Sequence, residues 1–150
     1  MLVTIDLTEE QLAALQVADR QRPYTMTAIV NDPQDVADYL AHLKHLKQEH
    51  SIVVTLNSRS RILRRHVISK GTVDAALVHP RDIFRVAIRD NAAKVILAHN
   101  HPSGDCSPSD DDITVTKRMV TAGKIMGIPV VDHLIIATEG YYSLQSHGHI

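Results

Sequence analysis

A short apolar run that ends in two histidines constrains the fold of this chain more than any other feature. Residues 92–98, Ala-Ala-Lys-Val-Ile-Leu-Ala, have the length and composition of a strand buried at the centre of a sheet, and His99-Asn100-His101 follows without a break. A loop with two prolines and a glycine then leads to a helical pattern over 109–126. Because a strand end and the start of the next helix are neighbours in space, the sequence predicts that polar side chains from both elements meet there.

Three side chains at this junction have the chemistry of a hydrolytic zinc site. His99 and His101 are two positions apart, so both imidazoles can face the same side of an extended backbone. Asp112 lies in the first turn of the predicted helix and can supply a third ligand. Two neutral nitrogens and one carboxylate leave the fourth tetrahedral position of zinc for water, whose pKa the metal lowers to about 7. We therefore expect His99, His101 and Asp112 to bind one Zn²⁺ ion.

Each of these residues alone has a simpler explanation. Ser109-x-x-Asp112 before an apolar run is a capping box, and the acidic residues 110–112 favour a helix N-terminus whatever their function. A single histidine at a strand end is more often a hydrogen-bonded polar residue than a ligand. Capping, however, does not require His-x-His at a fixed distance upstream, so the joint pattern favours the metal site. Both roles can coexist, because Ser109 can cap the helix while its hydroxyl proton faces the site.

The rest of the sequence has the organisation of one domain with an appendage. The 150 residues, 44% of them hydrophobic, suffice for a single buried core. We expect an N-terminal arm over residues 1–30 and a domain over 31–150. The patterns predict, in order, a short arm helix from Thr8, a helix over 33–48, a hairpin of strands 51–56 and 62–69, a helix from Pro80 and a closing hairpin of strands 130–137 and 141–144.

Composition narrows the classes of function and the compartment. Sixteen Lys and Arg residues nearly balance 17 Asp and Glu residues, so the molecule as a whole has no electrostatic reason to bind nucleic acid. A single cysteine, Cys106, excludes an internal disulfide and favours a reducing compartment. No apolar run approaches the roughly 18 residues that span a bilayer, and the first residues do not have the pattern of a secretory signal. We therefore expect a cytoplasmic protein with no membrane association.

The segment 99–112 also resembles a known family. It fits the JAMM pattern His-x-His-x7-Ser-x2-Asp, and its opening His-Asn-His-Pro-Ser-Gly is similar to the RadC family in particular. Residues 78–82, 91–93 and 132–135 extend the resemblance to about residues 33–150. The resemblance implies a JAB/MPN domain of the α/β (α+β) class, with a mixed sheet flanked by helices and similar to cytidine deaminases. Longer RadC-like proteins carry an N-terminal helix-hairpin-helix region, whose hairpins we do not find, so the chain resembles the short form.

Two further site residues follow from this resemblance. JAMM enzymes place a glutamate between a helix and the next strand, where it accepts a proton from the nucleophilic water and passes it to the leaving amine. Alignment of Leu56-Asn57-x-x-x-Arg61-Ile62 with the RadC-like strand and turn puts Glu49 at that position. Without the alignment, Glu49 reads as a solvated residue at the end of a charged helix. Ser109 is then expected to donate a hydrogen bond to the developing oxyanion.

Three functions remain as hypotheses. The first is a zinc metallopeptidase-like hydrolase that cleaves a peptide or isopeptide bond. The second is a DNA-repair-associated protein with a DNA-binding or nuclease-like accessory role, for which the four arginines in residues 59–65 are the main support, although they can equally line a solvated face. The third is a catalytically silent interaction module, which the complete ligand set disfavours. Cys106 is expected to be a bystander, and His133 is either a partner of the ligands or a core residue.

Overall fold

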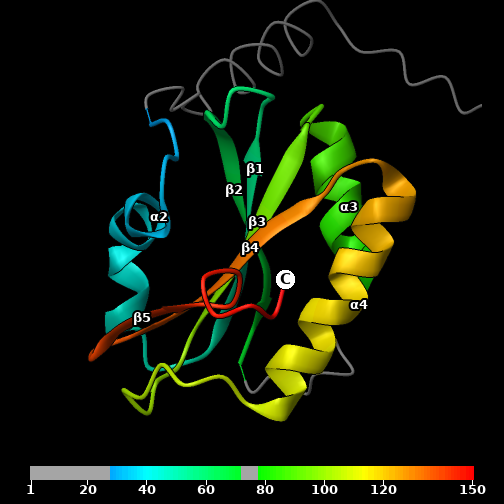
Figure 1. Cartoon of the computed structure of the whole chain (residues 1–150). Coiled ribbons are helices and arrows are strands. Elements are labelled where there is room, and N and C mark those ends of the chain that lie inside the picture. Colours follow the sequence, from blue (N-terminus) through cyan, green and yellow to red (C-terminus); the bar gives the residue numbers. More distant parts are fainter. Residues whose placement is uncertain (1–27, 72–77) are drawn as a thin grey trace, which may run out of the picture.

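A five-stranded mixed sheet forms the centre of the molecule in this computed structural model, which describes residues 28–71 and 78–150 (Figure 1). The order across the sheet is β2-β1-β3-β4-β5, and the β3–β4 pair is parallel while the other pairs are antiparallel. The strands are β1 (His50–Leu56), β2 (Ile62–Lys70), β3 (Lys94–Asn100), β4 (Val130–Ala137) and β5 (Gly140–Ser143). The predicted arm helix from Thr8 lies outside the described residues.

Helices cover both faces of this sheet, as Figure 1 shows. The described helices are α2 (Pro33–Tyr39), the 3₁₀ helix η1 (Ala41–His45), α3 (Pro80–Arg89) and α4 (Asp110–Met126). On one face α2 and η1 pack against the sheet through an aliphatic cluster that includes Val36, Leu40 and Leu43. On the other face α3 and α4 contribute Phe84 and Met119 to a second cluster. The expected mixed sheet flanked by helices is thus confirmed.

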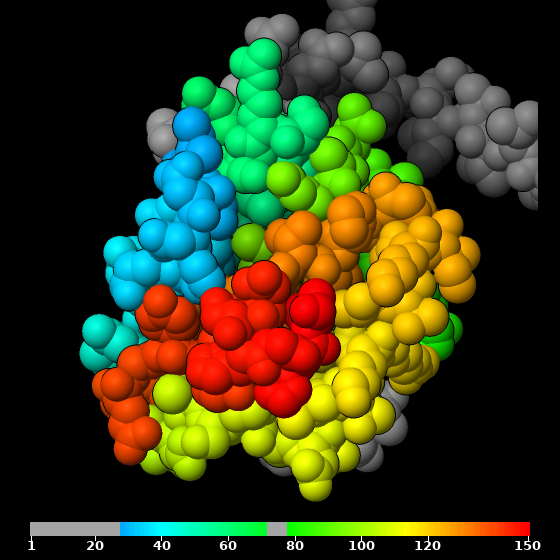
Figure 2. All heavy atoms as spheres, viewed as in Figure 1, coloured from blue at the N-terminus to red at the C-terminus, as the bar shows by residue number. Residues whose placement is uncertain are grey.

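Both predicted hairpins are present. β1 and β2 pair antiparallel, and the side-chain oxygen of Asn57 accepts hydrogen bonds from the backbone N–H groups of Arg59 and Arg61, both at 3.0 Å, which closes the turn between them. β4 and β5 form the closing hairpin. The C-terminal segment then folds back, and Figure 2 shows it (red) between the α2–η1 side and α4 on the visible face.

The single helix predicted over residues 33–48 is wrong. α2 ends at Tyr39, and the backbone continues as η1, in which Leu43 N–H bonds to Leu40 C=O at 2.9 Å and Leu46 N–H to Leu43 C=O at 3.1 Å. These leucines are spaced by three residues, which matches the three-residue turn of a 3₁₀ helix. The tighter turn keeps the row of leucines facing the sheet, whereas continued α-helical winding would rotate it away.

β3 occupies the central position that its composition predicted. It lies between β1 and β4, and every residue after Lys94 is buried. The chain leaves β3 at Asn100, crosses through α4 and returns as β4 parallel to β3. The start of α4 therefore lies at the carboxyl end of β3, which is the juxtaposition needed for the predicted site. Among the described residues, no helix has the length and apolar character needed to cross a membrane.

Candidate metal centre

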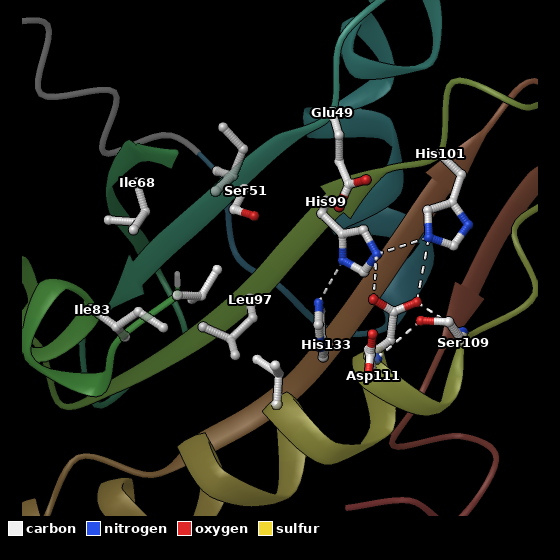
Figure 3. Close-up of a pocket in the computed structure, with 14 residues that line it drawn as sticks. Glu49, Ser51, Ile68, Ile83, Leu97, His99, His101, Ser109, Asp111 and His133 are labelled. Carbon is white, nitrogen blue, oxygen red and sulfur yellow. Dashed lines mark hydrogen bonds and ion pairs between the residues drawn. The ribbon is translucent and has the colours of Figure 1, made fainter. Parts of the chain in front are cut away.

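Three potential ligand atoms converge at the end of β3 (Figure 3). His99 Nε2 lies 3.1 Å from Asp112 Oδ1, His101 Nε2 lies 3.4 Å from Asp112 Oδ2, and the two Nε2 atoms are 3.0 Å apart. His99 is the penultimate residue of β3, His101 directly follows this strand, and Asp112 lies in the first turn of α4. His99 is buried, while His101 and Asp112 are half-buried. The structure thus brings together the three residues that the sequence singled out.

The hydrogen bonds of His101 fix the proton on one ring nitrogen. Its Nδ1 lies 2.9 Å from the backbone carbonyl oxygen of Asp105. A carbonyl oxygen only accepts hydrogen bonds, so Nδ1 carries the proton and donates it. In the neutral ring, Nε2 then keeps its lone pair and directs it toward Asp112 and His99.

A longer chain of hydrogen bonds fixes His99 in the same way. Thr116 Oγ1 donates to the carbonyl of Asp112 at 2.6 Å, so its lone pairs accept from His133 Nδ1, also at 2.6 Å. His133 Nε2 is then the acceptor for His99 Nδ1–H at 2.8 Å. Burial, reinforced by the neighbouring His99, lowers the pKa of His133 to about 3, which keeps this ring neutral. With Nδ1 of His99 protonated by this series of hydrogen bonds, the Nε2 lone pair of His99 faces His101 and Asp112.

Asp112 both caps α4 and faces the histidines. Its Oδ2 accepts a hydrogen bond from Ser109 N–H at 2.8 Å, and its own N–H donates to Ser109 Oγ at 3.1 Å. Burial acts to raise the pKa of Asp112. In the metal-free site, however, a ring of His101 or His99 that also carries a proton on Nε2 donates it to the carboxylate, and these bonds hold the pKa of Asp112 well below the usual range of a carboxyl. The bond to Asp112 in turn raises the pKa of His101. The capping box and the cluster therefore use the same carboxylate.

Glu49 directly precedes β1 and lines a cavity that is also lined by His99, His101 and Asp112. Asn100, which lies between the two histidines, holds the backbone on both sides of it: Asn100 Oδ1 accepts from His50 N–H at 2.7 Å and Asn100 Nδ2 donates to Gln48 C=O at 3.0 Å. Gly71 N–H bonds to the carbonyl of Glu49 itself at 2.9 Å. The segment that carries Glu49 is thus fixed from both neighbouring strands of β1.

Burial raises the pKa of the Glu49 carboxyl. His99 and His101 act in the opposite direction, and Asp112 adds to the rise. These electrostatic influences place Glu49 in the field of all three potential ligands. A half-buried carboxyl with a raised pKa holds a proton more readily than a free carboxyl, which is useful in a group that exchanges protons during a reaction.

The donor set fits a divalent cation. With both Nδ1 atoms protonated, two Nε2 lone pairs and a carboxylate oxygen point toward one another across about 3 Å, an arrangement in which nitrogens repel unless a cation or a proton lies between them. Two imidazole nitrogens and one carboxylate, with both rings oriented by hydrogen bonds, is the ligand chemistry that zinc uses in hydrolytic sites. His99, His101 and Asp112 would therefore hold the ion.

The cluster opens into a cavity of about 290 Å³. Its polar end is lined by Glu49, Ser51, Ser109, Asp111 and the three potential ligands. Figure 3 shows the side chains of Glu49, His99, His101 and Ser109 turned toward one another. Its other end is lined by aliphatic residues. A larger hollow of about 610 Å³ between α3 and α4 is lined by apolar and arginine side chains and has none of the three potential ligands in its wall.

The arginine-rich segment and Cys106 contribute nothing to this centre. Arg64 points toward Asp90, whereas its neighbour Arg65 lies over the ring of Tyr39 with its guanidinium 5.6 Å from the ring centre. The two residues therefore serve opposite faces of β2 and do not combine into one basic surface. Cys106 is half-buried and lines none of the cavities described above.

Sequence reasoning missed the supporting residues. Asn100 stands at the variable position of His-x-His, and Thr116 has the character of an ordinary helix residue, so the motif points to neither of them. The polar character of Asn100 inside a buried strand was the available signal, since a buried amide needs partners. The sequence allows His133 to be either a core residue or a partner of the ligands, and its contact with His99 favours the second interpretation.

Comparison with known proteins agrees with this fold. The RadC-like JAB domain family matches residues 30–149, and the chain belongs to that family. A protein named UPF0758 from Desulforamulus reducens is 45% identical over 139 residues, which cover 91% of this chain and 61% of that protein. A UPF0758 protein from Geobacillus thermodenitrificans is 41% identical over 142 residues, which cover 93% of this chain and 63% of that protein. The chain thus spans less than two thirds of the length of these relatives.

Proposed function

We propose that this chain is a zinc-dependent hydrolase of the JAMM type that cleaves an amide bond of a peptide or isopeptide. One observation carries the proposal: two hydrogen-bonded imidazoles and a carboxylate present their free lone pairs to a common point, and a carboxyl with a raised pKa lies over the same cavity. Membership of the JAB domain family supports it.

Each residue has a role in this proposal. Zinc, when bound, would supply Lewis acidity that polarises a carbonyl and makes water nucleophilic at neutral pH. Glu49 accepts the proton of the attacking water and donates it to the leaving amine, for which its raised pKa is suited. Ser109 Oγ accepts the capping bond from Asp112 N–H, so its own proton remains available to the substrate oxygen as negative charge develops.

The proposed role of Glu49 is tested by removing its proton transfer while preserving its shape. In Glu49→Gln, we expect turnover of a fluorogenic peptide or isopeptide by the zinc-loaded protein to fall about 10²- to 10⁴-fold, with zinc content unchanged. Glu139→Gln is the matched control, because Glu139 is exposed in the β4–β5 turn. Equal turnover in Glu49→Gln and wild type would remove Glu49 from the mechanism.

A DNA-associated role and a cytoplasmic location stay predictions. Arg64 and Arg65 lie on opposite faces of β2, so these two arginines do not form one basic surface that would support the DNA hypothesis.

A further inference from the structure

The cavity at the metal centre has two chemically distinct ends. Beyond His99, most of the described residues that line it are aliphatic, namely Ile52, Ile68, Val78, Ile83, Leu97 and Val115, and Ser51 and His133 border them. These come from β1, β2, the segment before α3, α3 itself, β3 and α4. Figure 3 shows Ile68, Ile83 and Leu97 gathered on the side away from His101 and Ser109. The apolar end therefore belongs to the same cavity as the polar end but is lined by different residues.

This wall is part of the molecular core. Ile83 and Leu97 are only 2% and 4% exposed, and both belong to the hydrophobic cluster between the sheet and helices α3 and α4. Ile68 packs against the same cluster. A surface built from core side chains is preformed, so a ligand that fills it does not have to order it first.

A bulge in β2 places Ile68 in the wall. Ser51 pairs with Ser69, but the next residue of β1, Ile52, pairs with Val67, so Ile68 has no partner across the strand. Ile68 lines the cavity, whereas Val67 is 51% exposed. Bulges next to a site commonly redirect one side chain in this manner.

We propose that the apolar end is a subsite for a compact branched aliphatic group attached next to the scissile amide. The inference rests on the proposed function, because it takes the polar end as the place of reaction. A charged group in this wall would lose its hydration without gaining a partner. The total volume of about 290 Å³ is at the small end for a ligand site, which limits the group to the size of a leucine or valine side chain.

A series of hydroxamates tests this subsite, because the hydroxamate binds zinc while its acyl group probes the wall. With the zinc-loaded 150-residue protein, we expect 3-methylbutanohydroxamate to bind at least about tenfold tighter than acetohydroxamate. Succinate monohydroxamate, whose acyl chain ends in a carboxylate, should bind no tighter than acetohydroxamate. Equal affinity for the aliphatic and acetyl compounds would overturn the subsite and leave the proposed function standing.

Two neighbouring substitutions assign the preference to the wall. Ile68→Thr keeps a β-branched residue in the strand but puts a hydroxyl into the cavity, and we expect it to reduce the aliphatic preference at least about threefold. Val67→Thr makes a similar change on the exposed side of the strand and should leave the preference unchanged. An unchanged preference in Ile68→Thr would overturn the assignment. Failure of every hydroxamate to bind would instead contradict the proposed function itself.

Discussion

At the scale of single residues, the centre depends on side chains that do not belong to the ligand pattern. Thr116 and His133 fix the ring of His99, while Asn100 fixes the backbone around Glu49. Each acts through hydrogen bonds whose direction follows from the donors and acceptors available. Their removal should therefore change the site in ways that can be separated from a general loss of stability.

Thr116→Val tests the chain of hydrogen bonds that ends at His99. Without the hydroxyl, His133 Nδ1–H loses its acceptor. The tautomer of His133 whose Nε2 accepts from His99 is then no longer favoured. We expect zinc affinity, measured by competition with a chelating dye, to fall about 10- to 100-fold. Histidine ¹⁵N chemical shifts of the metal-free protein should report the changed tautomer of His133.

Two further variants control for this substitution. Thr116→Ser keeps the hydroxyl and should restore zinc affinity. Thr121→Val removes an equivalent bond to the carbonyl four residues earlier on the exposed side of α4, at 3.0 Å from Lys117 C=O, and should leave affinity unchanged. Wild-type zinc affinity in Thr116→Val would show that the chain does not orient His99.

Asn100→Ala tests the clamp on the Glu49 segment. Gln48 C=O and His50 N–H lose their buried partner, so we expect the free energy of unfolding to fall by about 1–3 kcal/mol. The amide of His50 should exchange its hydrogen faster, and turnover should fall at least about tenfold while zinc content is retained. Asn31→Ala, at an exposed position, is the control. Unchanged exchange at His50 together with unchanged turnover would contradict the positioning role.

At the scale of elements, the carboxyl end of β3 and the N-terminus of α4 define the site together. The capping box fixes Asp112 in the first turn of α4, and the three aspartates there complement the positive end of the helix dipole. Ser109 thus has a structural role in α4 in addition to the proposed catalytic one, and the two roles can be separated.

Ser109→Ala and Ser109→Asp separate capping from catalysis. Loss of the cap in Ser109→Ala should lower the free energy of unfolding by about 1 kcal/mol in chemical denaturation and should also reduce turnover. Ser109→Asp restores an acceptor for Asp112 N–H but offers no donor to the substrate, so stability should recover while turnover does not. Ser103→Ala in the same loop is the control. Full turnover in Ser109→Asp would exclude the oxyanion role.

The sequence sufficed for the elements whose signal is local. The β1–β2 hairpin, the central place of β3 and the start of α4 at Ser109 follow from composition, turn residues and capping, all of which act between near neighbours. The break between α2 and η1 could not be predicted, because leucines three residues apart suit both an α-helix and a 3₁₀ helix until the position of the sheet is known.

The candidate site divides in the same way. His99, His101 and Asp112 share one short segment, so their spacing was enough to bring them together. Glu49 required the family alignment, because it reaches the cavity through the pairing of β1 with β3. The aliphatic wall gathers residues from six places along the chain, and only the folded sheet brings them to one cavity.

At the scale of the whole molecule, the sheet separates two cores and leaves one small cavity where the ligands, Glu49 and the aliphatic wall meet. The N-terminus of α4, the end of β3 and the start of β1 all have to be in place for that cavity to exist. We therefore propose that the fold assembles a site for one zinc ion.

Metal analysis of protein purified without a chelator tests this claim most directly. We expect about one zinc ion per wild-type chain and the loss of most of it in His101→Ala, while His45→Ala, which removes an exposed histidine from η1, should keep its zinc. Circular dichroism should confirm that His101→Ala remains folded. Equal zinc content in wild type and His101→Ala would contradict the account.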